Sequence, residues 1–302
     1  MPMEPRYKST FSVVARDPDN GKIAVGGGTY WFAYAVAVPF IEAGVGAVAT
    51  QALPNSAFGP KGLALLKSGL EPNAVIESLL ADDSAETERQ LLIINRQGRT
   101  AGHTGSSTIK FARHLCEDNF AAAGNMLANA DIVPGMVDFW HTSDLPFTER
   151  VIKTLQHAQD LGGDLRGKRS AGLLVAKADG TGASWNDIIY NLRIDDAVEP
   201  FQELERLYKL ASAYLEMNQG DSAYFDEHDN AKALHHYGQA LKLSPDNPEV
   251  QFWYAKLQHD TGNKAESDKM MGQLVAQDHR WQDLWDRVTP PSSAGYPRNN
   301  SS

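Results

Sequence analysis

The 302-residue sequence contains a single cysteine, Cys116, so no disulfide can form within the chain. No apolar run reaches the length of a membrane helix, and the first residues lack the apolar core of a signal peptide. The net charge is −10, and the lysines and arginines form no cluster. We therefore expect a cytoplasmic protein that binds neither nucleic acid nor a membrane.

Motifs that hold metals or nucleotides, or that position a catalytic serine, are also missing. The chain has no His-Glu-x-x-His zinc motif and no Gly-x-Ser-x-Gly nucleophile elbow. The three glycines at 26–28 permit close backbone approach, but they lack the Gly-Lys-Ser/Thr ending of a phosphate loop. The sequence therefore predicts a protein without a bound metal or cofactor.

Hydrophobic residues make up 42% of the chain and charged residues 22%, which is typical of a globular protein. Runs with the pattern of strands span 10–16, 22–28, 34–38, 45–51, 90–95, 99–103, 119–124, 170–176 and 188–194. Runs with the pattern of helices span 59–80, with a break at 69–72, then 131–140 and 146–161. Because the strands come in hairpins at both ends with helices grouped between them, the order predicts an α+β fold with antiparallel sheets covered by helices.

The pattern changes near residue 198, where apolar residues begin to recur at helical spacing and strand signals stop. Residues typical of a tetratricopeptide repeat (TPR) then occur at its offsets: Ala233, Tyr237, Ala240, Leu241, Pro245, Tyr254, Ala255 and Gly262. Residues 221–230 are interpreted as an insertion between two repeat helices. We therefore predict a first domain over 10–198, an all-α TPR-like module over 199–288 and a disordered tail over 289–302.

Seven blocks of the first domain, in order, carry a resemblance to a known family. They are Thr10-Phe-Ser-Val-Val-Ala-Arg-Asp17, Ala43-Gly-Val-Gly-Ala-Val-Ala-Thr-Gln51, Asn55 with Gly59-Pro60, Ala101-Gly-His-Thr-Gly105, Gly124-Asn-Met-Leu127, Gly162-Gly-Asp-Leu-Arg-Gly167 and Leu192-Arg-Ile-Asp-Asp196. Over nearly all of residues 10–200 the chain resembles the DUF1028 family, which is placed in the N-terminal-nucleophile (Ntn) hydrolase superfamily. The resemblance implies a four-layer αββα sandwich and hydrolysis of an amide bond, often after autoproteolysis exposes the nucleophile.

Thr10 begins the first predicted strand, and two interpretations of it are open. It is either an ordinary strand-starting residue or an amino-terminal nucleophile whose own α-amine removes the hydroxyl proton. The second interpretation requires cleavage between Ser9 and Thr10, with removal of residues 1–9. The chain is then an amidohydrolase for a small amide, peptide or lactam. The alternative is a non-catalytic protein that binds a ligand or peptide on the same fold.

Three further residues are candidates for the catalytic site. Ser12 lies two positions after Thr10 and points to the same side of the strand, where it supports the site or makes an ordinary structural hydrogen bond. The resemblance implies that a backbone N–H at the end of the strand over 45–51 donates a hydrogen bond to the oxyanion. Thr50 and Gln51 lie at that end and are the candidates. A tightly packed strand end is the alternative role for these two residues.

A cationic helper and a substrate-binding group complete the predicted site. The resemblance implies a cationic side chain near the nucleophile. No lysine or arginine occurs between Lys22 and Lys61, so Arg169 is the candidate for this role. His103 and Asn125 each end a strand and are flanked by glycine, so either one can hold a substrate amide or carboxylate, or serve a structural role. Arg166 and Asp164 pair with each other, cap a turn or bind substrate.

The helical module has about two repeat units, fewer than the roughly three that a free-standing stack needs. Its apolar stripe therefore packs on the first domain, on a second copy of the chain or on another protein. We expect a homo-oligomer, with a protein partner as the second possibility. The aromatic residues Phe252, Trp253, Tyr254, Trp281 and Trp285 are either interface anchors or the module's own core.

Overall fold

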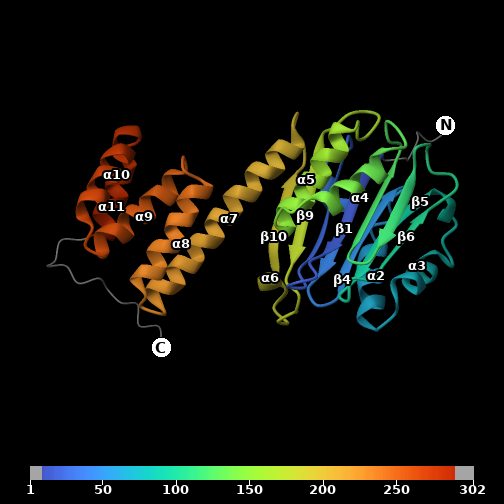
Figure 1. Ribbon diagram of the computed structural model, residues 1–302, viewed down its shortest axis with the longest axis horizontal. Coiled ribbons are helices and arrows are strands. Elements are labelled where there is room, and N and C mark those ends of the chain that lie inside the picture. Colours follow the sequence, from blue (N-terminus) through green and yellow to red (C-terminus); the bar gives the residue numbers. More distant parts are fainter. Residues whose placement is uncertain (1–8, 290–302) are drawn as a thin grey trace. The chain divides into compact units, whose positions relative to one another are not determined.

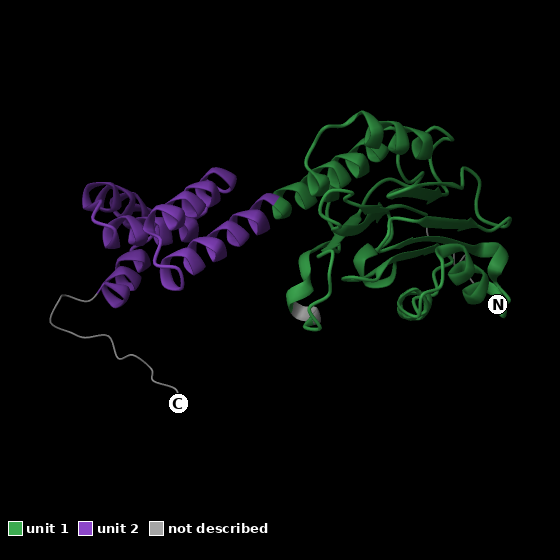
Figure 2. Ribbon diagram, turned by 60° about the horizontal axis from the view of Figure 1, so that its bottom comes forward, with its two compact units in different colours: residues 1–208 green, residues 209–302 purple. Residues whose placement is uncertain are grey.

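A computed structural model describes residues 9–289, apart from the side chains of residues 184 and 185. The chain divides into two compact units, residues 1–208 and 209–302, which Figure 2 shows in different colours. The division falls within one long helix, α7 (Pro200–Phe225). Apart from Thr289, the tail predicted to be disordered lies outside the described residues.

Two antiparallel sheets form the centre of the first unit. The larger sheet has the strand order β10-β9-β2-β1-β8-β7. Its strands are β1 (Thr10–Arg16), β2 (Ile23–Thr29), β7 (Arg113–Glu117), β8 (Phe120–Asn125), β9 (Ser170–Ala176) and β10 (Ile188–Ile194). The smaller sheet has the order β3-β4-β5-β6. Its strands are β3 (Pro39–Glu42), β4 (Gly46–Ala52), β5 (Arg89–Asn95) and β6 (Thr100–Thr104).

Helices cover the outer face of each sheet, as Figure 1 shows. The smaller sheet packs against α2 (Phe58–Lys67) and α3 (Pro72–Leu80), and the larger against α4 (Ile132–Thr142) and α5 (Phe147–Asp160). Three short helices also belong to this unit: α1 (Tyr34–Ala37), η1 (Glu86–Glu88) and α6 (Ser184–Asp187). The resulting helix–sheet–sheet–helix order confirms the predicted four-layer αββα sandwich.

Alternate residues of the strands face either the opposite sheet or a helix layer. Val14 of β1 and Leu92 of β5 belong to the core between the sheets. Val48 of β4 packs instead with residues of α2 and α3. Thr10 and Ser12 are at even positions like Val14, so the period of two places both residues on the face of β1 that meets the other sheet.

Two parts of the first unit differ from the sequence-based expectation. The alternation over 34–38 predicts a strand, but Tyr34–Ala37 forms the short helix α1. There Ala33 takes a left-handed conformation (φ 54°), and the Val38 amide donates to the Tyr34 carbonyl oxygen (3.3 Å), which closes a helical turn. The sequence patterns also miss β3 and β7, and β7 is a largely exposed edge strand without hydrophobic alternation.

The second unit is entirely helical in its described residues. After α7 it contains α8 (Asn230–Leu243), α9 (Pro248–Asp260), α10 (Lys264–Gln277) and α11 (Arg280–Val288). The expected insertion at 221–230 is wrong, because α7 continues to Phe225 and only 226–229 connect it to α8. The Asp229 side chain accepts a hydrogen bond from the Lys232 amide (2.9 Å) and thereby caps α8.

The aromatic residues of α9 and α11 pack on one another. Phe252 is fully buried, and its ring centroid lies 5.3 Å from that of Trp281 and 5.1 Å from that of Trp253. Phe252 thus belongs to the module's own core, and Trp253, Trp281 and Trp285 pack against it while staying partly exposed. Among residues 9–289, no helix has the length and apolar character needed to cross a membrane.

Candidate active site around Thr10

The peptide that joins Ser9 to Thr10 lies at the beginning of β1 and is almost inaccessible to solvent. Thr10 Oγ1 donates a hydrogen bond to the Ser9 carbonyl oxygen (2.6 Å). The same oxygen accepts hydrogen bonds from Thr29 Oγ1 and from Arg166 Nη2, the latter at 3.4 Å. Side chains from three separate segments therefore donate to the carbonyl that precedes Thr10.

Arg166 is held in place by Asp164, whose side chain is fully buried. Asp164 accepts hydrogen bonds from Arg166 Nη2 (2.9 Å), Nε (3.1 Å) and the Arg166 amide (2.9 Å). It also accepts one from the Tyr30 amide (2.8 Å), which fixes the segment after Thr29. The two residues thus pair with each other, as one interpretation of the sequence predicts, and the pair adjoins the Ser9 carbonyl.

A buried polar network connects the two sheets below Thr10. Ser12 Oγ donates to Gln51 Oε1 (2.6 Å), and Gln51 Nε2 donates to Gln90 Oε1 (2.7 Å). Asn125 Nδ2 donates to the same Gln90 oxygen (3.0 Å). Gln51 Nε2 and Asn125 Nδ2 also lie 3.4 Å from the Thr10 carbonyl oxygen. The network fixes β1 of the larger sheet against β4 and β5 of the smaller one.

Ser12 occupies a linking position in this network. Its hydroxyl hydrogen is donated to Gln51, so the phenol of Tyr34 (2.9 Å away) is the donor toward Ser12. Burial raises the pKa of the Tyr34 phenol, so this hydroxyl is protonated at neutral pH. Ser12 is therefore a structural support in this arrangement.

Two of the predicted site residues, Thr50 and His103, lie away from this arrangement, and a third, Arg169, lies at its edge. Thr50 faces the helix side of β4, where its hydroxyl lies near Asn55, and its amide donates to the Val38 carbonyl oxygen (3.1 Å). His103 hydrogen-bonds to the Glu86 carbonyl oxygen (3.1 Å). Arg169 lies 4.9 Å from the Tyr30 ring centroid and pairs with Asp196 (3.3 Å).

Thr29 and Gln90 are central here, although no sequence pattern singles out either one. Thr29 is the last residue of an apolar strand, and Gln90 follows Arg89 at the beginning of another, and polar residues near strand ends occur many times in the chain. Thr29 does follow the glycines at 26–28, and Gly27 lets β1 and Tyr34 approach closely: a Cβ there would lie 2.3 Å from the Phe11 carbonyl oxygen. That close approach is the one local signal that points to this end of β2.

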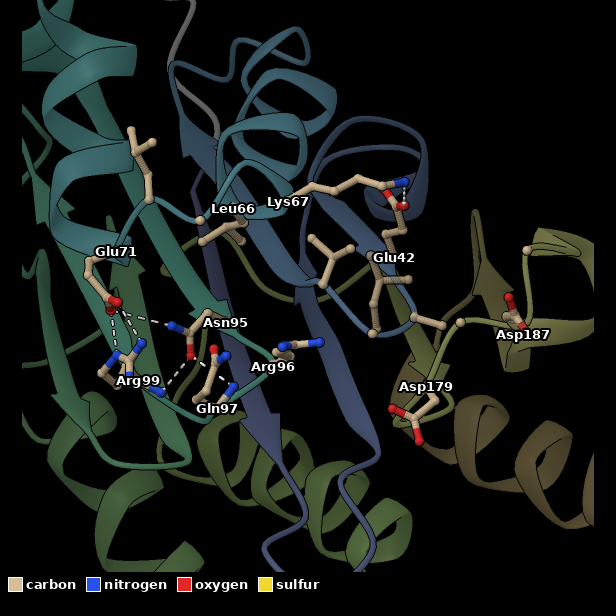
Figure 3. Close-up of a pocket in the computed structure, with 18 of the residues that line it drawn as sticks. Glu42, Leu66, Lys67, Glu71, Asn95, Arg96, Gln97, Arg99, Asp179 and Asp187 are labelled. Carbon is tan, nitrogen blue, oxygen red and sulfur yellow. Dashed lines mark hydrogen bonds and ion pairs between the residues drawn. The ribbon is translucent and has the colours of Figure 1, made fainter.

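Two cavities of the first unit bear on where a substrate binds. One, of about 210 Å³, is lined by Thr10 and Thr29 together with residues 31–34 and 36–38. A larger one, of about 1090 Å³, lies at the other end of the sheets, where Arg96 accepts a hydrogen bond from the last residue of β1 (2.8 Å). Figure 3 shows two ion pairs on its walls, Lys67–Glu42 and Arg99–Glu71. None of the predicted site residues lines this larger cavity.

The described residues contain no group of three or more His, Cys, Asp or Glu side chains arranged to hold a metal ion. The polar groups around Thr10 are hydroxyls, amides, the Arg166 guanidinium and the Asp164 carboxylate. This arrangement can bring a hydroxyl nucleophile and two hydrogen-bond donors, Thr29 and Arg166, to one carbonyl.

Comparison with known proteins identifies both parts of the chain. Residues 10–204 match a family of unknown function (DUF1028), and residues 224–287 match a tetratricopeptide repeat family. The crystal structure of protein SPO2555 from Silicibacter pomeroyi, a DUF1028 protein, is 27% identical, with a TM-score of 0.60 over 74% of this chain and 94% of that one. Anbu (ancestral beta-subunit) from Yersinia bercovieri is 11% identical, with a TM-score of 0.34 over 66% of this chain and 93% of that one.

No curated protein matches the sequence. The tetratricopeptide match confirms the predicted TPR-like character of the second unit. The match over residues 10–204 covers more than half of the chain, so this protein belongs to the DUF1028 family.

Proposed function

We propose that the protein is an Ntn-type amidohydrolase in which Thr10 becomes the nucleophile after the Ser9–Thr10 peptide is cleaved. Its substrate is a small amide, peptide or lactam. The observation that carries the proposal is the Ser9 carbonyl oxygen, which accepts hydrogen bonds from Thr10 Oγ1, Thr29 Oγ1 and Arg166. A carbonyl that is to be attacked by an adjacent hydroxyl needs donors at its oxygen, where negative charge develops.

In the proposed mechanism the chain is cleaved in two steps. Thr10 Oγ1 attacks the Ser9 carbonyl carbon, and Thr29 and Arg166 stabilise the oxyanion that forms. The C–N bond then breaks, the hydroxyl proton moves to the departing nitrogen, and the Ser9 acyl group is left as an ester on Thr10. Water hydrolyses that ester, which releases the carboxylate of Ser9 and frees both the hydroxyl and the α-amine of Thr10.

The same groups then serve an external amide. The α-amine, with an ordinary pKa of about 7.7–8.0, accepts the proton of Thr10 Oγ1 as the hydroxyl attacks the substrate carbonyl. Removal of Ser9 takes away the carbonyl oxygen to which Thr29 Oγ1 and Arg166 Nη2 donate, so both donors are available to the substrate oxyanion, while Asp164 still holds Arg166. The α-amine returns the proton to the leaving amine, and water hydrolyses the acyl ester. Arg169 adjoins this group through its contact with Tyr30, which also lies under Arg166.

Intact mass and amino-terminal sequencing test the proposal. The purified protein should begin at Thr10, and Thr10→Ala should retain the preceding residues. Thr29→Val should slow cleavage by about 10²–10³-fold, because it removes one oxyanion donor and keeps the shape of the side chain. Thr154→Val is the matched control, since Thr154 is equally buried but donates within α5. Wild-type protein that stays uncleaved yet hydrolyses amides would show that the Thr10 mechanism is wrong.

The second candidate function is a non-catalytic binding protein, and the second unit supplies the observation for it. Residues 224–287 match a repeat family, and a cavity of about 720 Å³ in that unit is lined by Tyr214, Tyr237 and Trp253 among others. In this case the first unit binds a ligand or peptide and the helical module mediates protein contact. An uncleaved chain with no amidase activity supports this candidate.

A further inference from the structure

The 210 Å³ cavity beside Thr10, called the Thr10 cavity below, has a wall of unusual composition for a site that handles amides. No charged side chain lines it. Its only side-chain hydroxyls are those of Thr10, Thr29 and Tyr34, and all three already take part in hydrogen bonds. The rest of the wall comes from Trp31, Phe32, Ala33, Val36, Ala37 and Val38.

Exposed apolar side chains also lie at the same end of the sheets as the cavity. Within the described residues of the first unit, eight large apolar side chains are exposed: Tyr30, Trp31, Phe32, Val36, Ile109, Phe111, Leu165 and Val198. All of them lie at the Thr10 end of the sheets. Ile109 and Phe111 accept backbone hydrogen bonds from Met126 and Leu127, which follow the β8 partner of Thr10. Trp31, Phe32 and Val36 among them line the Thr10 cavity itself, and exposed apolar surface at a cavity marks a binding site.

The arginines near the cavity do not make it a site for an anionic group. Arg166 is neutralised by the fully buried Asp164 (2.9 Å) and Arg169 by Asp196 (3.3 Å), so the four side chains carry no net charge. A carboxylate that entered the Thr10 cavity would lose its hydration and find no charged side chain on the wall. The Thr10 α-amine that processing exposes must be uncharged to accept the proton of Oγ1, so it offers no counter-charge in the reactive form.

We infer that the substrate of this site is an amide whose acyl group is neutral, unbranched or aromatic, and apolar, with about six carbons. The inference rests on the proposed function. A dry apolar cavity of about 150 Å³ accepts benzene, and the Thr10 cavity is somewhat larger at about 210 Å³. The acyl chain lies against Trp31, Phe32 and Val36 while its carbonyl takes the place of the Ser9 carbonyl. The reaction is that of a simple amide with water, which gives a carboxylate and ammonia or an amine.

Three amides with the same leaving group test the inference on the processed protein: hexanamide, glutaramate and acetamide. Glutaramate has nearly the length of hexanamide but ends in a carboxylate. We expect kcat/KM, measured by ammonia release, to be at least about 100-fold lower for glutaramate than for hexanamide. Acetamide, which lacks four methylenes worth about 4-fold each, should be about 200-fold poorer. Equal or better hydrolysis of glutaramate overturns the inference and leaves the proposed function standing.

A variant that fills the cavity provides a second test. Ala37→Leu adds bulk at the cavity wall on α1 and should lower kcat/KM for hexanamide by about 10–200-fold while leaving acetamide nearly unchanged. Ala64→Leu adds the same bulk on the exposed side of α2 and should change neither value. Equal losses for both substrates in Ala37→Leu contradict the inference.

A binding measurement separates this inference from the catalytic proposal. In the purified wild-type protein labelled with 5-fluorotryptophan, the ¹⁹F resonance of Trp31 is assigned by its loss in Trp31→Phe, and spectra are recorded before the amide is consumed. Hexanamide should shift that resonance, and glutaramate at the same concentration should not. Selective binding without any amide hydrolysis by the wild type refutes the catalytic function alone. The inference is refuted if hexanamide does not change the chemical shift of Trp31, or if glutaramate changes it equally.

Discussion

Gln90→Met tests whether the buried polar network holds the two sheets together. Gln90 is fully buried and has almost the shape of methionine. Its Oε1 accepts from Gln51 (2.7 Å) and Asn125 (3.0 Å), and its Nε2 donates to Thr104 Oγ1 (2.9 Å) and the Gly124 carbonyl oxygen (2.9 Å). The substitution keeps the volume and removes all of these bonds.

The expected loss follows from the groups left behind. The Gln51 and Asn125 amides lose their short acceptor and keep only 3.4 Å contacts to the Thr10 carbonyl oxygen. Each buried polar group that loses its hydrogen-bond partner costs about 1–3 kcal/mol. Two such amides, with a smaller loss at the Gly124 carbonyl, should lower the free energy of unfolding by about 3–5 kcal/mol.

Hydrogen exchange followed by mass spectrometry is the suitable assay, because it resolves the two units in the full chain. Protection should fall by about 10²–10⁴-fold in β1, β4, β5 and β8, and should not change in α9. Gln97→Met is the matched control, since Gln97 is exposed in the turn after β5. A loss below about 1 kcal/mol in Gln90→Met, or one as large in the control, refutes the reasoning.

Three further predictions concern pH, helix propensity and assembly. Hydrogen bonds from Arg89 hold the pKa of Asp83 below its ordinary value, so this carboxylate stabilises the fold above about pH 4, and the stabilisation is lost as the pH falls through the lowered folded-state pKa. Asp83→Asn should therefore lower the free energy of unfolding at neutral pH and have a shrinking effect toward about pH 2; an equal effect at both would contradict this. Gly238→Ala should stabilise the second unit by about 0.5–1 kcal/mol in thermal unfolding, because an added Cβ in α8 meets open space; destabilisation would show an unrecognised constraint. We also expect the full chain to self-associate through the helical module, and light scattering that finds a monomer at micromolar concentration excludes this.

Local pattern was sufficient for most elements of the first unit. The hairpin at 17–21, the buried strands and the two helices over 59–80 each follow from turn residues and apolar spacing within about ten positions. The period of two in β1 also places Thr10 and Ser12 on one face without knowledge of the opposite sheet. The edge strand β7 and the helix α1 escaped prediction because neither has a distinctive pattern: β7 is mostly exposed, and α1 alternates like a strand.

The candidate site depended on contacts that no local pattern records. The Ser9 carbonyl meets Thr29 from 20 positions away and Arg166 from 157 positions away, and Gln90 meets Asn125 across the sandwich. Residue spacing reports which face of a strand a side chain occupies, but not which residue of another sheet lies opposite to it. By itself the sequence determined the family, the four layers and Thr10 as the residue to consider. Only the packing of the two sheets decided that Gln51 and Asn125 approach Thr10 while Thr50 turns away, because a one-residue step along β4 reverses the face.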